Sequence, residues 1–156
     1  MIQTQEFVKQ EDVGVVAKID NFLSLKECAD LITSLTIKHK EKCFPFRDTI
    51  VLQMRLPLFN ERLNKYFNFY NFKEPSNQQL VIWPKGSKMG RHFDLNDKYS
   101  TIVYLNDDFE GGETIIEGLK FKPKAGSLLL FSNGTKIHEV KEIINGERYT
   151  LATWYV

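Results

Sequence analysis

RYTLATWYV, residues 148–156, is the longest of several short β-prone runs that decide the fold of this 156-residue chain. QLVIW (79–83), STIVYL (100–105) and SLLLF (127–131) share its content of β-branched, aromatic and aliphatic residues. Turn signals such as Pro84-Lys85-Gly86 separate these runs. Many short strands at even spacing are typical of an antiparallel sandwich or barrel. The remaining runs of this kind are ETIIE (113–117), LKFK (119–122) and IHEV (137–140).

The N-terminal half combines one strand pattern with two helical patterns. VGVVAKID (13–20) predicts one strand, and Ser24 followed by Glu27 is a capping box that starts an amphipathic helix over 24 to about 39. A second helix is expected from about Pro57 to Tyr70. Helices followed by strands suggest helices packed on the outside of one sheet.

We therefore expect a mainly β protein, a double-stranded β-helix (jelly-roll) barrel braced by N-terminal helices on one sheet. Its length predicts a single domain over residues 1–156. The helical support would cover roughly 21–72 and the jelly-roll core roughly 78–156.

Composition and charge narrow the classes of partner. The net charge is +1, from 21 basic and 20 acidic residues, so nothing indicates the concentrated basic face of a nucleic-acid-binding protein. The run at 38–42 is basic, but cations complement the end of a helix. Cys28 and Cys43 indicate reduced thiols, and the chain shows neither a secretory signal nor a 20-residue apolar span. We expect a cytoplasmic protein without membrane or nucleic-acid partners.

The candidate chemistry lies in the β half. His92 and Asp94 are two residues apart in GRHFDLN, so in a strand both would project to one face. His138 lies on a later strand that could reach the same interior. Two histidines and one carboxylate on one face of a metal are the arrangement of non-haem iron(II) oxygenases. Taken alone, a His-x-Asp pair is more often a turn aspartate beside an exposed histidine than a metal site.

Arg148, ten residues after His138, strengthens the hypothesis of a site. A guanidinium inside a barrel is unfavourable unless it meets a carboxylate, which it can bind through paired hydrogen bonds. An exposed strand arginine paired with Glu142 or Glu147 is the alternative interpretation.

The second half of the chain resembles the prolyl-hydroxylase branch of the iron(II)- and 2-oxoglutarate-dependent oxygenases. The matching pieces occur in family order and cover about half the chain. They are His92-Phe93-Asp94, Tyr104-Leu105-Asn106, Gly111-Gly112-Glu113-Thr114, Pro123 with Gly126, Leu128 and Phe131, His138-Glu139-Val140, and Gly146-x-Arg148-Tyr149 leading to Trp154.

The resemblance implies roles for individual residues. His92, Asp94 and His138 match the iron ligands and thus the catalytic centre, and Arg148 matches the residue that binds the far carboxylate of 2-oxoglutarate. Tyr104 matches a tyrosine that helps to hold this carboxylate, although a core aromatic is the alternative. Thr114 and Trp154 match cosubstrate-pocket positions, with plain packing as the alternative. The expected cofactors are Fe(II) and 2-oxoglutarate, with ascorbate as a further candidate.

The expected activity is hydroxylation of a prolyl residue in a peptide or protein. The same chemistry on a small molecule or another residue, and a non-oxidative cupin-like metal-binding module, are the alternatives. The chain departs from the family pattern at Trp83, where many members carry Tyr. The stretch from Asp94 to Tyr104 is also short, which leaves little material for a substrate lid.

Strand register gives a geometric test of the role of Arg148. Asn145-Gly146 predicts a hairpin in which a two-residue turn would pair His138 with Thr153 and turn Arg148 away from the metal. We expect instead a bulged register, because a one-residue slip exchanges the two faces. Arg148, Thr150, Ala152 and Trp154 would then face the pocket, and Tyr149, Leu151 and Thr153 would face the helices.

Overall fold

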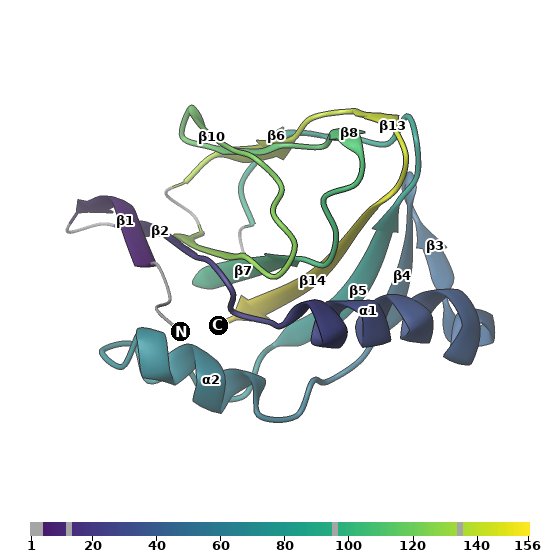
Figure 1. Cartoon of the computed structure of the whole chain (residues 1–156). Coiled ribbons are helices and arrows are strands. Elements are labelled where there is room, and N and C mark those ends of the chain that lie inside the picture. Colours follow the sequence, from purple (N-terminus) through teal and green to yellow (C-terminus); the bar gives the residue numbers. More distant parts are fainter. Residues whose placement is uncertain (1–4, 12–13, 95–96, 134–135) are drawn as a thin grey trace.

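The computed structural model describes residues 5–11, 14–94, 97–133 and 136–156. A large antiparallel sheet runs through the middle of the molecule (Figure 1). Helices cover one of its faces, and smaller sheets stand over the other face. This layering separates a packed core on the helix side from a cavity on the opposite side.

The large sheet has eight strands in the order β1-β2-β11-β7-β14-β5-β4-β3. Its middle strands are the runs that the sequence predicts most strongly. The bounds are β1 Gln5–Glu11, β2 Gly14–Ile19, β3 Phe44–Phe46, β4 Thr49–Gln53, β5 Asn77–Trp83, β7 Tyr99–Tyr104, β11 Leu128–Ser132 and β14 Arg148–Tyr155.

Two smaller sheets complete the β structure, one of four strands in the order β10-β9-β12-β6 and one that pairs β13 with β8. The mainly β class is thus confirmed. The described strands form separate sheets that face one another, so the expected closed barrel is not seen. The bounds are β6 Met89–His92, β8 Glu110–Gly111, β9 Thr114–Ile116, β10 Leu119–Phe121, β12 His138–Val140 and β13 Ile143–Asn145.

The first helix begins at the predicted capping box. In α1 (Leu25–Thr33), the Ser24 hydroxyl accepts a hydrogen bond from the Glu27 N–H, and the Glu27 carboxylate accepts one from the Ser24 N–H. A π-helical turn, η1 (Ser34–Lys38), continues α1 to the predicted end.

The second helix is shorter than expected. It is α2 (Phe59–Tyr66), and the residue before it, Leu58, has a left-handed backbone conformation. A short 3-10 turn, η2 (Lys40–Lys42), follows the first helix. No helix among the described residues is long and apolar enough to cross a membrane. Cys28 and Cys43 are free thiols, as predicted.

The region expected to be helical support contains two strands instead of helix alone. β3 and β4 form a hairpin that joins the edge of the large sheet, with β4 paired to β5. β4 contributes to both faces of the sheet, because side chains of a strand alternate in direction. Thr49 and Val51 line the cavity, Leu52 packs in the helix-side core, and Ile50 and Gln53 are exposed. The prediction of helical support over all of 21–72 is therefore wrong for residues 44–53.

The core on the helix side joins both helices to the large sheet. Leu31 and Leu63 from the helices pack in one cluster with Leu80, Val103 and Leu151 from the central strands. Each of these side chains is almost fully buried. Burial of apolar area at roughly 25 cal/mol per Å² is the dominant favourable term here. Packing against the helices thereby fixes the position of the large sheet, whose other face lines the cavity.

The expected hairpin at Asn145-Gly146 is not formed, in either register. β13 pairs with β8, and β14 pairs with β5 and β7 of the large sheet. Residues 138 and 148 therefore lie in different sheets, because the chain crosses between layers after β13. The predicted division of faces along β14 is nevertheless confirmed. Arg148, Thr150, Ala152 and Trp154 line the cavity, whereas Leu151 and Tyr149 pack in the helix-side core.

Candidate active site

Three potential metal ligands meet at the edge of the small sheet. His92 ends β6, and His138 begins β12 directly opposite it in the antiparallel pairing. Residues opposite each other share a face, so both imidazoles point the same way. Asp94 lies two residues beyond the end of β6, outside the strand. Its approach to the histidines comes from the path of the loop and not from strand alternation.

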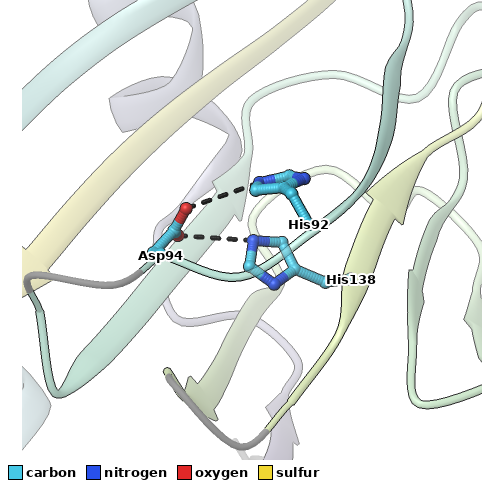
Figure 2. A group of neighbouring side chains, drawn as sticks. All are labelled: His92, Asp94 and His138. Atoms are coloured by element: carbon cyan, nitrogen blue, oxygen red, sulfur yellow. Dashed lines mark ion pairs between the residues drawn. The ribbon is translucent and has the colours of Figure 1, made fainter.

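Figure 2 shows the two imidazoles and the carboxylate turned toward one another. Asp94 Oδ1 lies 3.4 Å from His92 Nε2, and Asp94 Oδ2 lies 3.3 Å from His138 Nε2. One ligand atom from each residue falls within 4.8 Å of the other two. His138 is buried, and His92 and Asp94 are partly exposed. This is a compact N,N,O donor set with one side open.

Backbone carbonyls orient both imidazoles. His92 Nδ1 lies 2.7 Å from the Gly90 carbonyl oxygen, and His138 Nδ1 lies 3.2 Å from the Lys136 carbonyl oxygen. A carbonyl only accepts, so each Nδ1 carries a proton. In the neutral imidazole, Nε2 then has the lone pair that binds a metal, whereas in the imidazolium Nε2 also carries a proton and can donate to a carboxylate. In both histidines, Nε2 is the ring atom that faces Asp94. Support of this kind is typical of metal-binding histidines.

The charges in this group stabilise one another. Burial alone would raise the pKa of Asp94, but hydrogen bonds from His138 and His92 outweigh burial and hold that pKa well below its usual range. The hydrogen bond with Asp94 raises the pKa of His92 against the opposing effect of burial. The carboxylate is therefore ionised at any physiological pH and available as a metal ligand.

The large sheet holds Asp94 from the other side. Trp154 Nε1 donates to Asp94 Oδ2 at 3.1 Å, and the Ser100 hydroxyl donates to the same oxygen at 3.2 Å. Asn133 Nδ2 donates in turn to Ser100 Oγ at 2.7 Å. Sequence reasoning missed Ser100 and Asn133, which become neighbours only through the pairing of β7 with β11. No local pattern marks either residue.

A cavity of about 530 Å³ opens between the sheets at this point. His92, Asp94 and His138 line it, as does Arg148 on the large sheet. A volume of this size suits a small-molecule ligand. The prediction that Arg148 shares a cavity with the triad is thus confirmed, although the pairing that brings it there is different from the expected one.

Arg148 is buried at 1% exposure. Its Nη2 donates to Thr114 Oγ1 at 3.0 Å, and Thr114 is hydrogen-bonded to the Tyr104 hydroxyl. Tyr104 and Thr114 are fully buried beside the guanidinium and do not line the cavity. Their direct contact with a cosubstrate stays a prediction, whereas their support of Arg148 is visible. No carboxylate in the described part of the chain pairs with Arg148.

The residues present fit both expected groups. Two imidazole nitrogens and an ionised carboxylate, with an open face, suit iron(II). Arg148 leaves its Nε without a hydrogen-bond partner in a buried position, which an anion from outside the chain would satisfy. Burial also lowers the pKa of the Arg148 guanidinium, as expected for a cation without a counter-ion.

Known proteins resemble this chain in both sequence and structure. The sequence pattern of the 2OG-Fe(II) oxygenase superfamily matches residues 74–156. The prolyl 3-hydroxylase 2 of Rattus norvegicus is 40% identical over 65 residues, which cover 36% of this chain and 9% of that protein. A PKHD-type hydroxylase of Prochlorococcus marinus is 37% identical over 82 residues, which cover 45% of this chain and 37% of the relative. The matches thus span less than half of either relative.

Solved structures share the fold over nearly the whole chain. A prolyl-4-hydroxylase of Pseudomonas putida gives a TM-score of 0.70 at 20% identity, covering 90% of this chain and 91% of that chain. A viral collagen prolyl hydroxylase from Paramecium Bursaria Chlorella virus-1, solved with 2-oxoglutarate, gives 0.70 at 21% identity, covering 90% and 96%. The chain therefore shares the overall fold of these enzymes. With the pattern matched over more than half of its residues, the chain belongs to the 2OG-Fe(II) oxygenase superfamily.

Proposed function

We propose that this protein is an iron(II)- and 2-oxoglutarate-dependent dioxygenase that hydroxylates a prolyl residue in a peptide or protein. One observation carries the proposal. The His92, Asp94 and His138 donor set and the buried, unpaired Arg148 line the same cavity. A metal site alone would not require the buried Arg148 guanidinium in the same cavity. A dicarboxylate cosubstrate that also chelates the metal explains both features.

Each residue has a defined task in this proposal. His92, Asp94 and His138 would hold iron(II), and Arg148 would bind the carboxylate of 2-oxoglutarate far from the metal. When bound, these groups supply oxidation of a C–H bond by dioxygen, with succinate and carbon dioxide as co-products. Arg148 orients the cosubstrate, and the packed large sheet keeps the inner end of the cavity dry. Ascorbate is the candidate reductant and belongs in every assay.

The mouth of the cavity supports a peptide substrate. Phe46 and Phe93 line the cavity and remain 52% and 40% exposed, and Arg47 lies with its guanidinium 5.5 Å from the Phe46 ring centroid. Exposed aromatic side chains beside a reaction site offer apolar surface for a proline ring. The prolyl hydroxylase relatives favour the same substrate class.

Binding is the first test. Under anaerobic conditions, the protein with iron(II) and 2-oxoglutarate should develop the weak visible absorption of their chelate. Arg148→Met should lose this absorption at the same cosubstrate concentration. A protein that binds a metal but not 2-oxoglutarate would be the cupin-like alternative, because that class needs no buried arginine beside the ligands.

Turnover identifies the substrate. Proline-rich peptides incubated with the protein, iron(II), 2-oxoglutarate and ascorbate should gain about 16 daltons by mass, the addition of one oxygen to a C–H bond. Amino-acid analysis should then find hydroxyproline, with succinate formed in equal amount. Whether the product is 3- or 4-hydroxyproline shows whether the activity resembles that of the prolyl 3-hydroxylase relative or that of the prolyl-4-hydroxylase relative. Succinate formed equally with and without every peptide would favour a small-molecule substrate.

A further inference from the structure

Trp83 forms part of the inner wall of the proposed cosubstrate cavity. It ends β5 and lies directly opposite Arg148 in the pairing of β5 with β14, two strands that run side by side in Figure 1. Residues paired in this way share a face, and both side chains line the cavity. Trp83 is 7% exposed. The indole thus lies beside the guanidinium and next to the space that a ligand would fill.

Two hydrogen-bond donors are left unused here. Trp83 Nε1 and Arg148 Nε are buried, and neither has a partner among the described residues. An indole N–H can only donate, so no rearrangement of its own would satisfy it. Buried donors without partners are rare in native proteins, and each one needs an explanation. Two of them on neighbouring side chains in one cavity wall point to a single acceptor.

The missing acceptor should be an anion. The Arg148 Cζ lies 4.8 Å from the Trp83 ring centroid and 5.1 Å from that of Tyr104, so aromatic side chains hold the guanidinium in place. These rings attract the cation but accept no conventional hydrogen bond from it. A carboxylate has two oxygens with several lone pairs and can accept from both donors.

We propose that Trp83 is a specificity-determining residue, whose indole N–H donates to the 2-oxoglutarate carboxylate that Arg148 binds. This inference rests on the proposed function. Phenylalanine would also place an aromatic ring against Arg148, without a buried N–H to satisfy. Packing alone therefore does not explain a buried indole N–H at this position. The indole N–H makes the inner end of the cavity selective for ligands that carry a second carboxylate.

The test uses a variant and a ligand that each remove one partner. Trp83→Phe keeps an aromatic ring over Arg148 and deletes the N–H. 2-Oxopentanoate has the chain length of 2-oxoglutarate with a methyl group in place of the far carboxylate. Val81→Ala is the control, because Val81 lines the same wall two residues earlier on β5 and donates nothing. Binding is measured by calorimetry on the zinc(II)-loaded protein.

Trp83→Phe should bind 2-oxoglutarate roughly 10- to 100-fold more weakly, the range for a hydrogen bond to a charged group. Its affinity for 2-oxopentanoate should change less than about threefold, and Val81→Ala should affect both ligands equally. Equal losses for both ligands in Trp83→Phe, or no loss, would overturn the inference. A wild-type protein that binds 2-oxoglutarate no better than 2-oxopentanoate would overturn the proposed function itself.

A second measurement follows ligand binding in the wild-type protein itself. The chain has two tryptophans, so two indole N–H signals are expected in a nitrogen-15 NMR spectrum. Trp83→Phe assigns them. In the zinc(II)-loaded wild-type protein, 2-oxoglutarate should move the Trp83 signal downfield and slow its exchange with solvent, and 2-oxopentanoate should not. A Trp83 signal that responds identically to both ligands would contradict the inference.

Discussion

Trp154 and Asp94, 60 residues apart in the chain, are joined by a hydrogen bond of 3.1 Å from the indole Nε1 to the carboxylate Oδ2. The Ser100 hydroxyl donates to the same oxygen. Oδ2 is therefore occupied from the side of the large sheet. Oδ1, which receives neither of these bonds, is the oxygen better placed to bind a metal.

Trp154→Phe should weaken metal binding by about 10- to 100-fold, the usual effect of removing a group that orients a ligand. Cobalt(II) titration, followed by its visible absorption, measures this directly. At saturating metal, the affinity for 2-oxoglutarate should stay near that of the wild type. The reverse result, normal metal affinity with poor cosubstrate binding, would place Trp154 in the cosubstrate pocket and not behind Asp94.

Asp94→Ala should abolish iron-dependent succinate formation while the protein remains folded. The side chain lines the cavity and contributes no core packing, so the fold should survive its removal. The midpoint of thermal unfolding should still fall, because Trp154 Nε1 and the Ser100 hydroxyl lose their acceptor. Some metal sites of this kind tolerate loss of the carboxylate, which makes His138→Ala the stricter variant. Wild-type turnover in His138→Ala would show that the triad is misassigned.

Arg148→Met should separate stability from function. The guanidinium is buried without an acidic partner, so a similar apolar side chain should leave the free energy of unfolding within about 1 kcal/mol of wild type or raise it. Affinity for 2-oxoglutarate should fall on the order of 100-fold, since paired charge-assisted bonds are lost. Arg148→Lys, which keeps the charge and loses the planar fork, should lie between the two. Unchanged cosubstrate affinity in Arg148→Met would remove the anchor from the proposal.

Metal affinity should depend on pH through His92. The pKa of His92 is raised in the folded protein, mainly by its hydrogen bond with Asp94, and only the neutral imidazole binds metal. Cobalt(II) affinity should therefore rise as pH increases through the folded pKa of His92, with about a tenfold loss per unit below it. Asp94 has a lowered pKa and stays ionised over this range.

The stability of the metal-free protein should change in the opposite sense. A raised histidine pKa contributes stability that is fully present below the unfolded value of about 6.5 and is lost as pH rises through the folded pKa. Thermal unfolding of the metal-free protein should show this loss relative to His92→Gln. Parallel pH curves for the two proteins would contradict the assignment.

Gly126→Ala should be strongly destabilising. Gly126 has a φ of +86°, and an added Cβ would lie 2.4 Å from the Leu23 carbonyl oxygen, where the chain enters α1. We expect a loss of about 2 kcal/mol or more, combining backbone strain with a steric clash. Gly118→Ala is the matched control, since its φ is +79° and nothing lies within 4 Å of the new Cβ. Its cost should be about 1 kcal/mol, from backbone strain alone. Urea unfolding compares the two, and equal losses would mean that the contact with Leu23 is unimportant.

Local patterns in the sequence were sufficient for several features. The capping box at Ser24 and Glu27 starts α1 as predicted, because both partners lie within one helical turn. Alternation along residues 148–155 correctly assigns the faces of β14, since side chains of a strand alternate regardless of its neighbours. The chemistry of His92, Asp94, His138 and Arg148 is likewise carried by the residues themselves.

Only the tertiary structure decided which segments pair and what surrounds the site. The hairpin expected at Asn145-Gly146 gave way to pairing of β14 with β5 and β7, which buries Leu151 in the helix-side core. The contacts of Trp154 and Ser100 with Asp94 join separate strands to a loop, so no periodicity encodes them. Strand partners are selected by the burial of whole faces, a property of the complete chain. A turn signal of two residues cannot outweigh it.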